Sequence, residues 1–395
     1  MDILILAICS LSFLWWLELA VEWWVAGRLG ENLSDLPPGQ VSERSGGVTL
    51  SVIIPARDEG AALPEALASV MAALPPGGEA ILVDDRSSDD TGLIASGIAR
   101  SDHRLKVLRI RDVPEDWLGK NHALQKGFEE ASGTFLLFTD ADVVFQPGCL
   151  ARALALCERD GLDHLVATPR VITVGFWERV FVPFFSILLV SRYRIWRASV
   201  PGSPFYAGIG AFNMVRRGAY ERAGTHAALK NEVVDDLMLG KLMKKTGGRQ
   251  GVVSAERCVS VRWHEGITGL VTGLEKNAYA AFEFKPVRTL FGCLGLLAVT
   301  WIPFFASLLY RPGLRGLLGI SAIGGYGVWL SFAALYGLAA RGTGASWLYF
   351  VTFPAGSFLM VWAIVRSAVL YHLRGGVKWR GTIYKGPRSK VQGPK

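Results

Sequence analysis

Four long apolar runs bracket a more polar middle section, and they constrain the fold more than any other feature of the sequence. The first run covers residues 3–27, and the others cover residues 290–309, 314–340 and 346–370. A helix of about 20 apolar residues is long enough to cross a bilayer. The first run is longer than the apolar core of a signal peptide and is followed by no small-residue cleavage pattern. We therefore expect a retained membrane helix, and an integral membrane protein.

Positive charge is concentrated at one end of the chain. Lys and Arg outnumber Asp and Glu by 42 to 34, which gives a net charge of +8. Such an excess suits nucleic acid, anionic lipid or phosphate-bearing ligands. Residues 372–395 follow the last apolar run and contain seven basic and no acidic residues, as segments at the cytoplasmic face of a membrane do. We expect a membrane-facing basic tail and no nucleic-acid partner, with a plainly solvated terminus as the alternative.

The side of the membrane that this tail reaches depends on how many of the last three runs cross. Three full crossings would put the tail across the membrane from the middle section, whereas the positive-inside rule favours both on the cytoplasmic side. Pro303 interrupts residues 290–309, so this run is our preferred candidate for a re-entrant hairpin. That hypothesis also keeps Arg311 and Arg315 inside. From the sequence, both topologies stay open.

The middle section alternates short β-rich runs with helical patterns. We expect strands at residues 50–54, 80–83, 106–109, 134–139 and 164–167. This alternation predicts an α/β fold with a mostly parallel sheet, whose ligands gather at the carboxyl ends of the strands. Residues 176–198 combine Phe, Val and Leu with five charged residues. An amphipathic helix at the membrane interface explains that mixture better than a spanning helix does.

These features divide the chain into five expected parts. They are a membrane helix at residues 1–30, a linker at 31–47, an α/β domain at 48–286, membrane segments at 287–372 and the basic tail at 373–395. The linker contains Pro, Gly and Ser, which favour irregular structure. The five cysteines form no Cys-x-x-Cys pair, so we interpret them as reduced packing residues rather than a zinc site or a disulfide framework.

Acidic residues follow the first two predicted strands. The first strand ends in Ile-Pro-Ala-Arg-Asp-Glu, which contains Pro55, Arg57 and Glu59. The second ends in Val-Asp-Asp-Arg-Ser-Ser-Asp-Asp-Thr, whose first acids are Asp84 and Asp85. In an open α/β sheet, such strand ends lie at the ligand-binding edge. Asp and Ser also cap following helices, so the residues alone leave a binding role and a capping role open.

Two further motifs carry charge that suits a diphosphate. Gly119 and Lys120 open a predicted helix, where backbone amides and an ammonium can meet phosphate oxygens. Asp140 and Asp142 stand two residues apart directly after an apolar strand, and they offer oxygen ligands to a hard divalent cation. Taken alone, such a lysine is more often a surface residue, and such an acidic pair is more often an Asx turn.

A third group of motifs lies toward the end of the middle section. Asp235 and Asp236 precede an amphipathic helical pattern, where a carboxylate acts either as a general base or as a helix cap. Gly208 and Gly210 lie in an Ala-Gly-Ile-Gly-Ala run, which suits a close approach to a ligand or a plain turn. The run Val-Ser-Val-Arg-Trp-His ends in side chains that suit contact with a sugar or a phosphate, which are Arg262, Trp263 and His264.

Together these motifs resemble those of family 2 glycosyltransferases over about residues 51–284. The matching elements are the Ile-Pro strand end, the Asp-Asp-x-Ser-x-Asp-x-Thr loop, the Gly-Lys-x-x-Ala-Leu-x-x-Gly helix, the Asp-x-Asp turn and the Asp-Asp helix start. The resemblance implies a GT-A fold, which is a Rossmann-like nucleotide-binding domain with a mostly parallel mixed sheet, here flanked by transmembrane helices. Membrane-bound members that act on sphingolipid (ceramide glucosyltransferase), carotenoid or hopanoid acceptors carry similar flanking segments.

The resemblance also implies roles for individual residues. A Mg or Mn ion would be held by Asp142 and Asp140, and the general base would be Asp236, with Asp235 as the fallback. The nucleotide sugar would be bound by a larger set, with Asp85 the first candidate for the base contact: Pro55, Arg57, Glu59, Asp84, Asp85, Lys120, Asp140, Gly208 and Gly210.

The Arg-Trp pair is similar to the Gln-x-x-Arg-Trp motif of processive polysaccharide synthases and of ceramide glucosyltransferase. Position 259 of this chain is Val where that motif has Gln. We expect Arg262, Trp263 and His264 to contact the acceptor or the product, with a structural role as the alternative for His264.

The sequence thus predicts an inverting glycosyltransferase of a bacterial inner membrane, with its catalytic domain in the cytoplasm. A single displacement would move a sugar from a nucleotide diphosphate donor to a lipid acceptor, while Asp236 takes the acceptor proton. A processive polysaccharide synthase is one alternative, disfavoured by the few spanning segments and by Val259. A non-catalytic sugar-nucleotide-binding membrane protein is another, disfavoured by the retained acids. A nucleotidyltransferase would need a Gly-rich, Arg-bearing loop near Ile54, which the sequence lacks.

Overall fold

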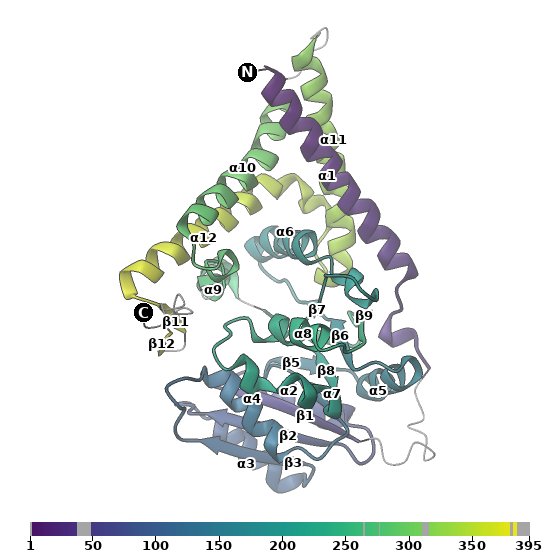
Figure 1. Cartoon of the computed structure of the whole chain (residues 1–395), viewed down its shortest axis with the longest axis vertical. Coiled ribbons are helices and arrows are strands. Elements are labelled where there is room, and N and C mark those ends of the chain that lie inside the picture. Colours follow the sequence, from purple (N-terminus) through teal and green to yellow (C-terminus); the bar gives the residue numbers. More distant parts are fainter. Residues whose placement is uncertain are drawn as a thin grey trace, which may run out of the picture. The chain divides into compact units, whose positions relative to one another are not determined.

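The chain folds into two compact units, each assembled from separate stretches of sequence (Figure 1). The computed structural model describes residues 2–37, 49–263, 265–275, 277–309, 316–379 and 382–384. His264, most of the expected linker, residues 310–315 and most of the basic tail lie outside these ranges. The helical unit comprises residues 1–29, 172–192 and 263–395, and the sheet unit comprises residues 30–171 and 193–262.

A seven-stranded mixed sheet forms the centre of the sheet unit. Its strands, in chain order, are β1 (Leu50–Ala56), β2 (Glu79–Asp85), β3 (Leu105–Ile110), β4 (Phe135–Phe138), β6 (His164–Thr168), β8 (Asn213–Arg216) and β9 (Gln250–Ser254). Across the sheet they follow the order β3-β2-β1-β4-β8-β6-β9. The first four run parallel, β8 is antiparallel to β4 and β6, and β9 is parallel to β6. The five strands expected from the sequence are confirmed, and the sheet also contains β8 and β9.

Helices cover both faces of this sheet, because buried side chains alternate along its strands. On β1, Val52 and Ile54 face one side and Ile53 faces the other. The Val52 face packs against α2 (Leu63–Ala73), α3 (Thr91–Ser101) and α5 (Cys149–Asp160). The Ile53 face packs against α4 (Gly119–Glu130), α7 (Arg217–Ala223) and α8 (Asp235–Lys245). This three-layer arrangement confirms the predicted α/β fold with a mostly parallel sheet.

Short elements complete the sheet unit. A small second sheet joins β5 (Val143–Phe145), β10 (Val259–Val261) and β7 (Arg170–Val171), with β10 antiparallel to β5 and parallel to β7. Short 3-10 helices lie at η1 (Leu33–Asp35), η2 (Ile195–Ser199) and η3 (His226–Leu229). The five cysteines of the chain are free and buried, in agreement with the packing role predicted for them.

The helical unit holds long apolar helices. In the described part of the chain, four helical segments are long and apolar enough to cross a membrane. They are α1 (Asp2–Leu29), α10 (Pro286–Leu308), α11 (Leu317–Thr343), and η5 (Trp347–Thr352) continuing into α12 (Phe353–Arg374). The unit also contains the shorter helices α6 (Phe176–Tyr193), α9 (Gly266–Glu275) and η4 (Ala280–Phe282), and the short strands β11 (Val377–Trp379) and β12 (Thr382–Tyr384).

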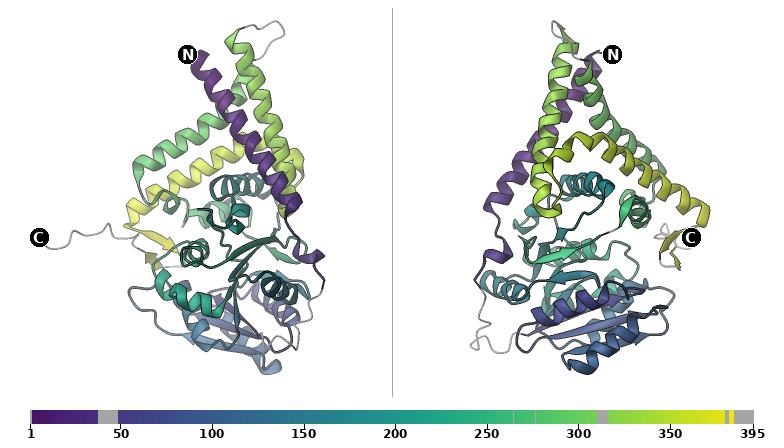
Figure 2. Two further views of the ribbon diagram at one scale, coloured as in Figure 1. Left: turned by 45° about the vertical axis from the view of Figure 1, so that its right-hand side comes forward. Right: turned by 180° about the vertical axis from the view of Figure 1, so that it is seen from behind.

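Helices α1 and α11 run side by side in the same direction (Figures 1 and 2). Near their amino ends, the Cβ position of Gly324 lies 3.2 Å from Cys9. Farther along, the rings of Trp16 and Phe332 pack with centroids 4.8 Å apart. Small residues such as Gly324 and Cys9 let two helices approach closely, which is how helices associate in a lipid environment.

Helix α10 is continuous across Pro303, so the hairpin expected within residues 290–309 is wrong. A proline removes one hydrogen-bond donor from a helix, but membrane helices tolerate it where a neighbouring helix packs closely. Here the neighbour is α11, because a Cβ on Gly325 would lie 2.5 Å from the carbonyl oxygen of Pro303. One turn later, Trp329 Nε1 donates to Ser307 Oγ at 3.0 Å and ties the same two helices together.

The segment that turns back is the last one. Phe353 opens α12 and stacks on Phe332 with ring centroids 4.2 Å apart. Phe332 lies 11 residues before the end of α11 at Thr343, which corresponds to about 16 Å of helix. Helix α12 therefore starts partway along α11, and Figures 1 and 2 show it inclined to that helix.

The far end of α12 returns to the start of α10. Tyr371 stacks on Phe284, just before α10, with ring centroids 4.8 Å apart. Between the two ends, Trp301 Nε1 donates to Ser357 Oγ at 3.0 Å, so α12 runs antiparallel to α10. Near its carboxyl end α12 also binds α9, because Ser367 Oγ donates to the carbonyl oxygen of Glu275 at 2.6 Å.

The fit of α4 on the sheet gives a test of this packing. A Cβ on Gly127 would lie 2.4 Å from Ile53 Cγ2, so we expect Gly127→Ala to lower the stability by about 1–3 kcal/mol through overpacking. Gly97 on α3 has only the tip of Arg100 within 4 Å of its Cβ position. The control Gly97→Ala should therefore be neutral or stabilise by up to about 1 kcal/mol. Thermal unfolding of the two detergent-purified variants measures the difference, and equal effects would contradict it.

Candidate active site

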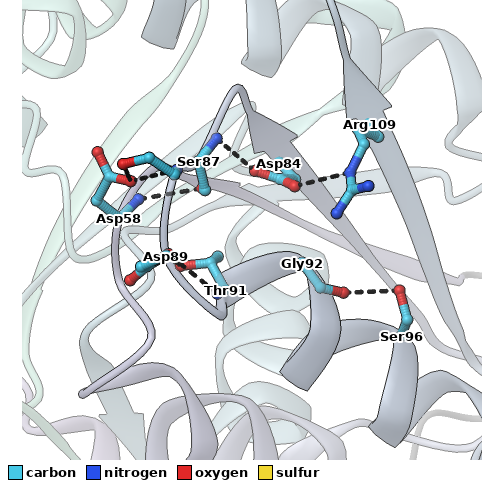
Figure 3. A network of polar contacts seen from close by, with 9 residues as sticks. Asp58, Asp84, Ser87, Asp89, Thr91, Gly92, Ser96 and Arg109 are labelled. Carbon is cyan, nitrogen blue, oxygen red and sulfur yellow. Dashed lines mark hydrogen bonds and ion pairs between the residues drawn. The ribbon is translucent and has the colours of Figure 1, made fainter.

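The loops that follow β1 and β2 are tied to each other (Figure 3). The backbone N–H of Asp58 donates to Ser87 Oγ at 3.1 Å, and the Asp58 carboxylate accepts from the backbone N–H of Ser88 at 2.7 Å. The Asp84 carboxylate accepts from the N–H of Ser87 at 3.0 Å and from Arg109 Nε at 3.2 Å. The acids at these strand ends therefore also shape the loops, and Asp84 is committed to that task.

Asp85 lies beside the start of α4. Its carboxylate accepts from Arg86 Nε at 2.8 Å and lies 4.0 Å from Arg57 Nη1. A Cβ on Gly119 would lie 2.3 Å from Asp85 Oδ2, so the approach of this carboxylate requires glycine at the first position of α4. Asp84 and Asp85 are adjacent in the sequence but have different surroundings: Asp84 is bound within the loops, and Asp85 lies at the start of α4.

An ammonium group joins three parts of the chain that are distant in sequence. Lys120 Nζ lies 2.7 Å from Asp140 Oδ1 and 3.5 Å from Asp235 Oδ2. These residues stand at the start of α4, in the turn after β4 and at the start of α8. Burial alone would lower the pKa of Lys120, but the charges of Asp140, Asp235 and Asp236 raise it, so the side chain carries its proton at neutral pH.

Asp236 is held by two backbone N–H groups. Gly210 donates to Asp236 Oδ2 at 2.8 Å and Leu237 donates to Asp236 Oδ1 at 2.8 Å. Burial and the charge of Asp235 raise the pKa of Asp236 to about 6, against the lowering effects of Lys120 and of the Leu237 N–H. A carboxylate with that pKa is ionised at neutral pH and more basic than an ordinary aspartate, as a general base needs to be.

The loop that contains Gly208 and Gly210 lies against both acidic turns. The carbonyl oxygen of Gly210 accepts from the backbone N–H of Asp140 at 3.1 Å. A Cβ on Gly210 would lie 2.4 Å from Asp140 Oδ2, and one on Gly208 would lie 1.9 Å from the carbonyl oxygen of Asp236. Both glycines are therefore required by close approach. Their loop links the turn after β4 to the start of α8.

Asp142 lies in an environment that disfavours its charge. Burial, followed by the charges of Asp140 and Glu59, raises the pKa of Asp142 to about 7. Such a gathering of carboxylates is the donor set that a hard divalent cation prefers. Within the described ranges, however, no group of three or more His, Cys, Asp or Glu side chains is arranged to hold a metal ion.

One pocket of the sheet unit collects many of these groups. Six of its lining residues were singled out from the sequence: Pro55, Lys120, Asp140, Gly210, Asp235 and Asp236. The other six were not named as candidate site residues: Leu124, Phe138, Thr139, Asn213, His226 and Leu239. Six further predicted residues of the same unit make the contacts described above but are not among the lining residues: Arg57, Glu59, Asp84, Asp85, Asp142 and Gly208.

His226 is the most notable residue that the sequence did not reveal. Its ring is buried, and its pKa is lowered to about 4 by that burial, so it is neutral at pH 7. Tyr220 Oη accepts from the backbone N–H of His226 at 2.8 Å and contacts the ring at Nδ1 at 2.6 Å. Because His226 stands outside every motif, the sequence gives no sign that it lines this pocket.

Of the predicted Arg-Trp-His group, the described residues Arg262 and Trp263 are not part of the pocket lining. Arg262 is exposed at the end of the sheet unit. Trp263 belongs to the helical unit, where it stacks on Phe185 of α6 with ring centroids 4.6 Å apart. His264 lies outside the described residues.

Comparison with known proteins agrees with this architecture. Residues 51–224 match the family model of Glycosyl transferase family 2. The 4,4'-diaponeurosporenoate glycosyltransferases of Staphylococcus aureus strains MRSA252 and USA300 are 26% and 25% identical to the chain, and each alignment covers 85% of this chain and 88% of the relative.

A solved structure shares the fold across both units. It is the mannosyltransferase PcManGT from Pyrobaculum calidifontis in complex with GDP-Man and Mn²⁺, which is 17% identical, with a TM-score of 0.56. The alignment covers 94% of this chain and 98% of that chain. The predicted GT-A fold, flanked by helices apolar enough to span a membrane, is thereby confirmed.

The close approach at Gly208 gives a test of the site. Because a Cβ there would collide with the backbone of Asp236, we expect Gly208→Ala to shift this residue and to lower sugar transfer by about 100-fold. Gly218 in α7 has only the tip of Arg222 within 4 Å of its Cβ position, so Gly218→Ala is the matched control and should transfer normally. Transfer rates per folded enzyme measure both, and normal transfer by Gly208→Ala would contradict the expected displacement.

Proposed function

We propose a reaction for this chain, which carries a Glycosyl transferase family 2 domain and is a glycosyltransferase. In this proposal it moves a sugar from a nucleotide diphosphate donor to a membrane lipid, with inversion at the anomeric carbon. The observation that carries the proposal is the convergence of Lys120, Asp140 and Asp236 on one pocket. The pocket thus contains both a carboxylate that can accept a proton and an ammonium group that can bind phosphates, as a single displacement requires.

Asp236 is the proposed general base. Its carboxylate accepts the proton of the acceptor hydroxyl as the hydroxyl oxygen forms a bond to the anomeric carbon. The bond from that carbon to the diphosphate oxygen breaks in the same step, and the electron pair leaves with the diphosphate. The raised pKa of Asp236 supports this role, and the two backbone N–H groups fix the direction in which the carboxylate points.

The donor is proposed to bind across the carboxyl ends of β1, β2 and β4. Lys120 supplies a positive charge for the diphosphate, and the start of α4 supplies backbone N–H groups that favour anions. Asp85 is the proposed contact for the nucleotide base, because Asp84 is held by Ser87 and Arg109. The GDP-Man complex of the P. calidifontis mannosyltransferase supports a nucleotide diphosphate sugar as the class of donor.

A Mg or Mn ion fits the carboxylates of Asp140 and Asp142. The raised pKa of Asp142 indicates that its negative charge lacks full compensation, and the Mn²⁺ in the P. calidifontis complex supports the choice of metal. When bound, such an ion would offset the negative charge that develops on the leaving diphosphate. In the proposal, Asp142 is the main protein ligand and Asp140 assists it, while Lys120 holds Asp140 in place.

The proposed acceptor is a lipid at the membrane surface. The relatives named for 4,4'-diaponeurosporenoate support an apolar carotenoid-type acceptor. A lipid hydroxyl must lose a proton during transfer and so needs a base, whereas an ionised carboxylate has no proton to lose. Transfer to a hydroxyl lipid should therefore depend on Asp236, whereas transfer to a carboxylate lipid should not.

The decisive assay incubates the purified enzyme with a panel of nucleotide sugars and a total lipid extract, with mass spectrometry of the new glycolipids. Transfer to a hydroxyl lipid should fall by about 100-fold or more in Asp236→Asn, because the amide cannot accept the proton. Asp160→Asn removes a partly exposed acid that pairs with Arg159 and should leave transfer unchanged. Full activity of Asp236→Asn on a hydroxyl lipid would refute the assigned base, and products with many added sugars would favour a processive synthase.

We also propose that the sheet unit lies in the cytoplasm beside a bacterial membrane. Within the helical unit, α1 and α11 run in one direction and α10 runs in the opposite one (Figures 1 and 2), so each is assigned a full crossing. Helix α12 begins partway along α11 and returns to the start of α10, so it is assigned no net crossing. Both ends of α6 continue directly into the sheet unit, which supports the interfacial position predicted for it.

This topology places the basic tail on the side where α1 ends and the sheet unit begins. The conflict with the positive-inside rule then disappears, because the tail, Arg28, Arg288 and Arg341 share that side. Residues 310–315, which include only two basic residues, are assigned to the other side. The turn-back is thus assigned to the last apolar segment.

Reporter fusions test this topology. Green fluorescent protein fused after Lys395 should fluoresce, and alkaline phosphatase fused there should be inactive, because both would be cytoplasmic. Alkaline phosphatase inserted at residues 310–315 should be active. An active phosphatase at the C-terminus would mean that α12 crosses the membrane, and would overturn the proposed arrangement.

A further inference from the structure

A buried network of three polar side chains lies behind the active site. His164, Asn213 and Gln250 open the neighbouring strands β6, β8 and β9, and each is at most 3% exposed. His164 Nε2 lies 3.0 Å from Asn213 Oδ1, and Gln250 Nε2 lies 2.6 Å from His164 Nδ1. Only Asn213 lines the pocket, and the chemistry proposed above uses none of the three. We call these three side chains the amide–imidazole network.

The network holds the backbone of the glycine loop, residues 207–210. The N–H of Ala207 donates to Gln250 Oε1 at 2.9 Å, and Gln250 Nε2 donates to the carbonyl oxygen of Ala207 at 3.0 Å. Asn213 Oδ1 accepts from the N–H of Ile209 at 3.4 Å. These side chains therefore do for the loop what a neighbouring strand would do, because unpaired buried backbone groups are costly.

These contacts fix the state of the imidazole. The N–H of Ala207 can only meet an acceptor, so Gln250 presents its NH₂ to His164 Nδ1. The N–H of Ile209 likewise requires Asn213 Oδ1, so His164 Nε2 must be the donor. His164 is therefore neutral with its proton on Nε2, and every hydrogen bond of the network has one direction.

The glycine loop contacts the residues that carry the active-site carboxylates, Asp140 and Asp236. Gly210 donates to Asp236 and accepts from the backbone of Asp140. Gly208 lies against the backbone of Asp236, and Ala207 lies under α8, because a Cβ on Gly240 would be 1.7 Å from the carbonyl oxygen of Ala207. A shift of the loop therefore moves the carboxylate of Asp236 relative to Asp140.

We propose that His164, Asn213 and Gln250 are positioning residues that set the orientation of the Asp236 carboxylate through the loop at residues 207–210. The inference rests on the proposed role of Asp236 as base. It assigns function to three polar residues of the sheet that touch neither the proton nor the phosphates.

The test compares three variants of the full-length enzyme in detergent. His164→Leu removes both hydrogen bonds while keeping an apolar side chain of similar size. His164→Gln keeps one donor and one acceptor and is the conservative rescue. Ser51→Ala is the matched control, because Ser51 is also fully buried in the sheet and makes two hydrogen bonds, to Glu79 and Gly133, at the amino end of β1.

Kinetics separate positioning from mere stability. Active sites are counted by calorimetric titration with UDP and with GDP in the presence of Mn²⁺, so that kcat refers to folded enzyme. We expect kcat of His164→Leu to fall by about tenfold or more, with the donor KM changed by less than about threefold. His164→Gln should recover most of the lost kcat. Ser51→Ala should lower the unfolding temperature and leave kcat unchanged.

Several outcomes overturn the inference. The inference is wrong if His164→Leu has the kcat of the wild type. It is also wrong if Ser51→Ala loses as much kcat as His164→Leu does. Should His164→Leu not fold, Gln250→Met is held to the same criterion. The two proposals fail separately: activity in Asp236→Asn removes the proposed base, whereas an inactive Asp236→Asn beside a fully active His164→Leu removes only the positioning role.

Discussion

The ammonium of Lys120 makes the rest of the site possible. Asp140, Asp235 and Asp236 come from two distant turns and meet within a partly buried space. Two like charges about 4 Å apart near a protein surface repel each other by about 4 kcal/mol. The lysine offsets that repulsion, and its own pKa rises in consequence. The three side chains can therefore lie close together, as a site for proton and phosphate chemistry requires.

The second constraint is the absence of side chains at Gly208 and Gly210. Their loop touches both acidic turns, so it carries the geometry of one to the other. Behind it, the strands β6, β8 and β9 hold the loop by side-chain amides and an imidazole. The central sheet therefore positions the pocket from two sides. Strand β4 places the turn that contains Asp140, and strands β6, β8 and β9 hold the glycine loop.

The sequence predicted the parts of the fold and the site that rest on local patterns. β-Rich runs marked the parallel strands, and charged motifs at strand ends and helix starts marked Lys120, Asp140 and Asp236. It missed what depends on packing between distant segments. β9 is short, and His226 stands in no motif. His164 and Gln250 come together only through the register of the sheet. Pro303 was misread because close packing at Gly325 lets α10 continue.

The stereochemistry of the product tests the account most directly. A base on one side of the anomeric carbon and a departing diphosphate on the other allow a single displacement only. Proton NMR of the sugar at early reaction times reports the anomeric configuration of the first product before any exchange. The account predicts a configuration opposite to that of the donor. A retained configuration would mean that the carboxylates at this pocket do other chemistry, and the proposed arrangement of base and leaving group would be wrong.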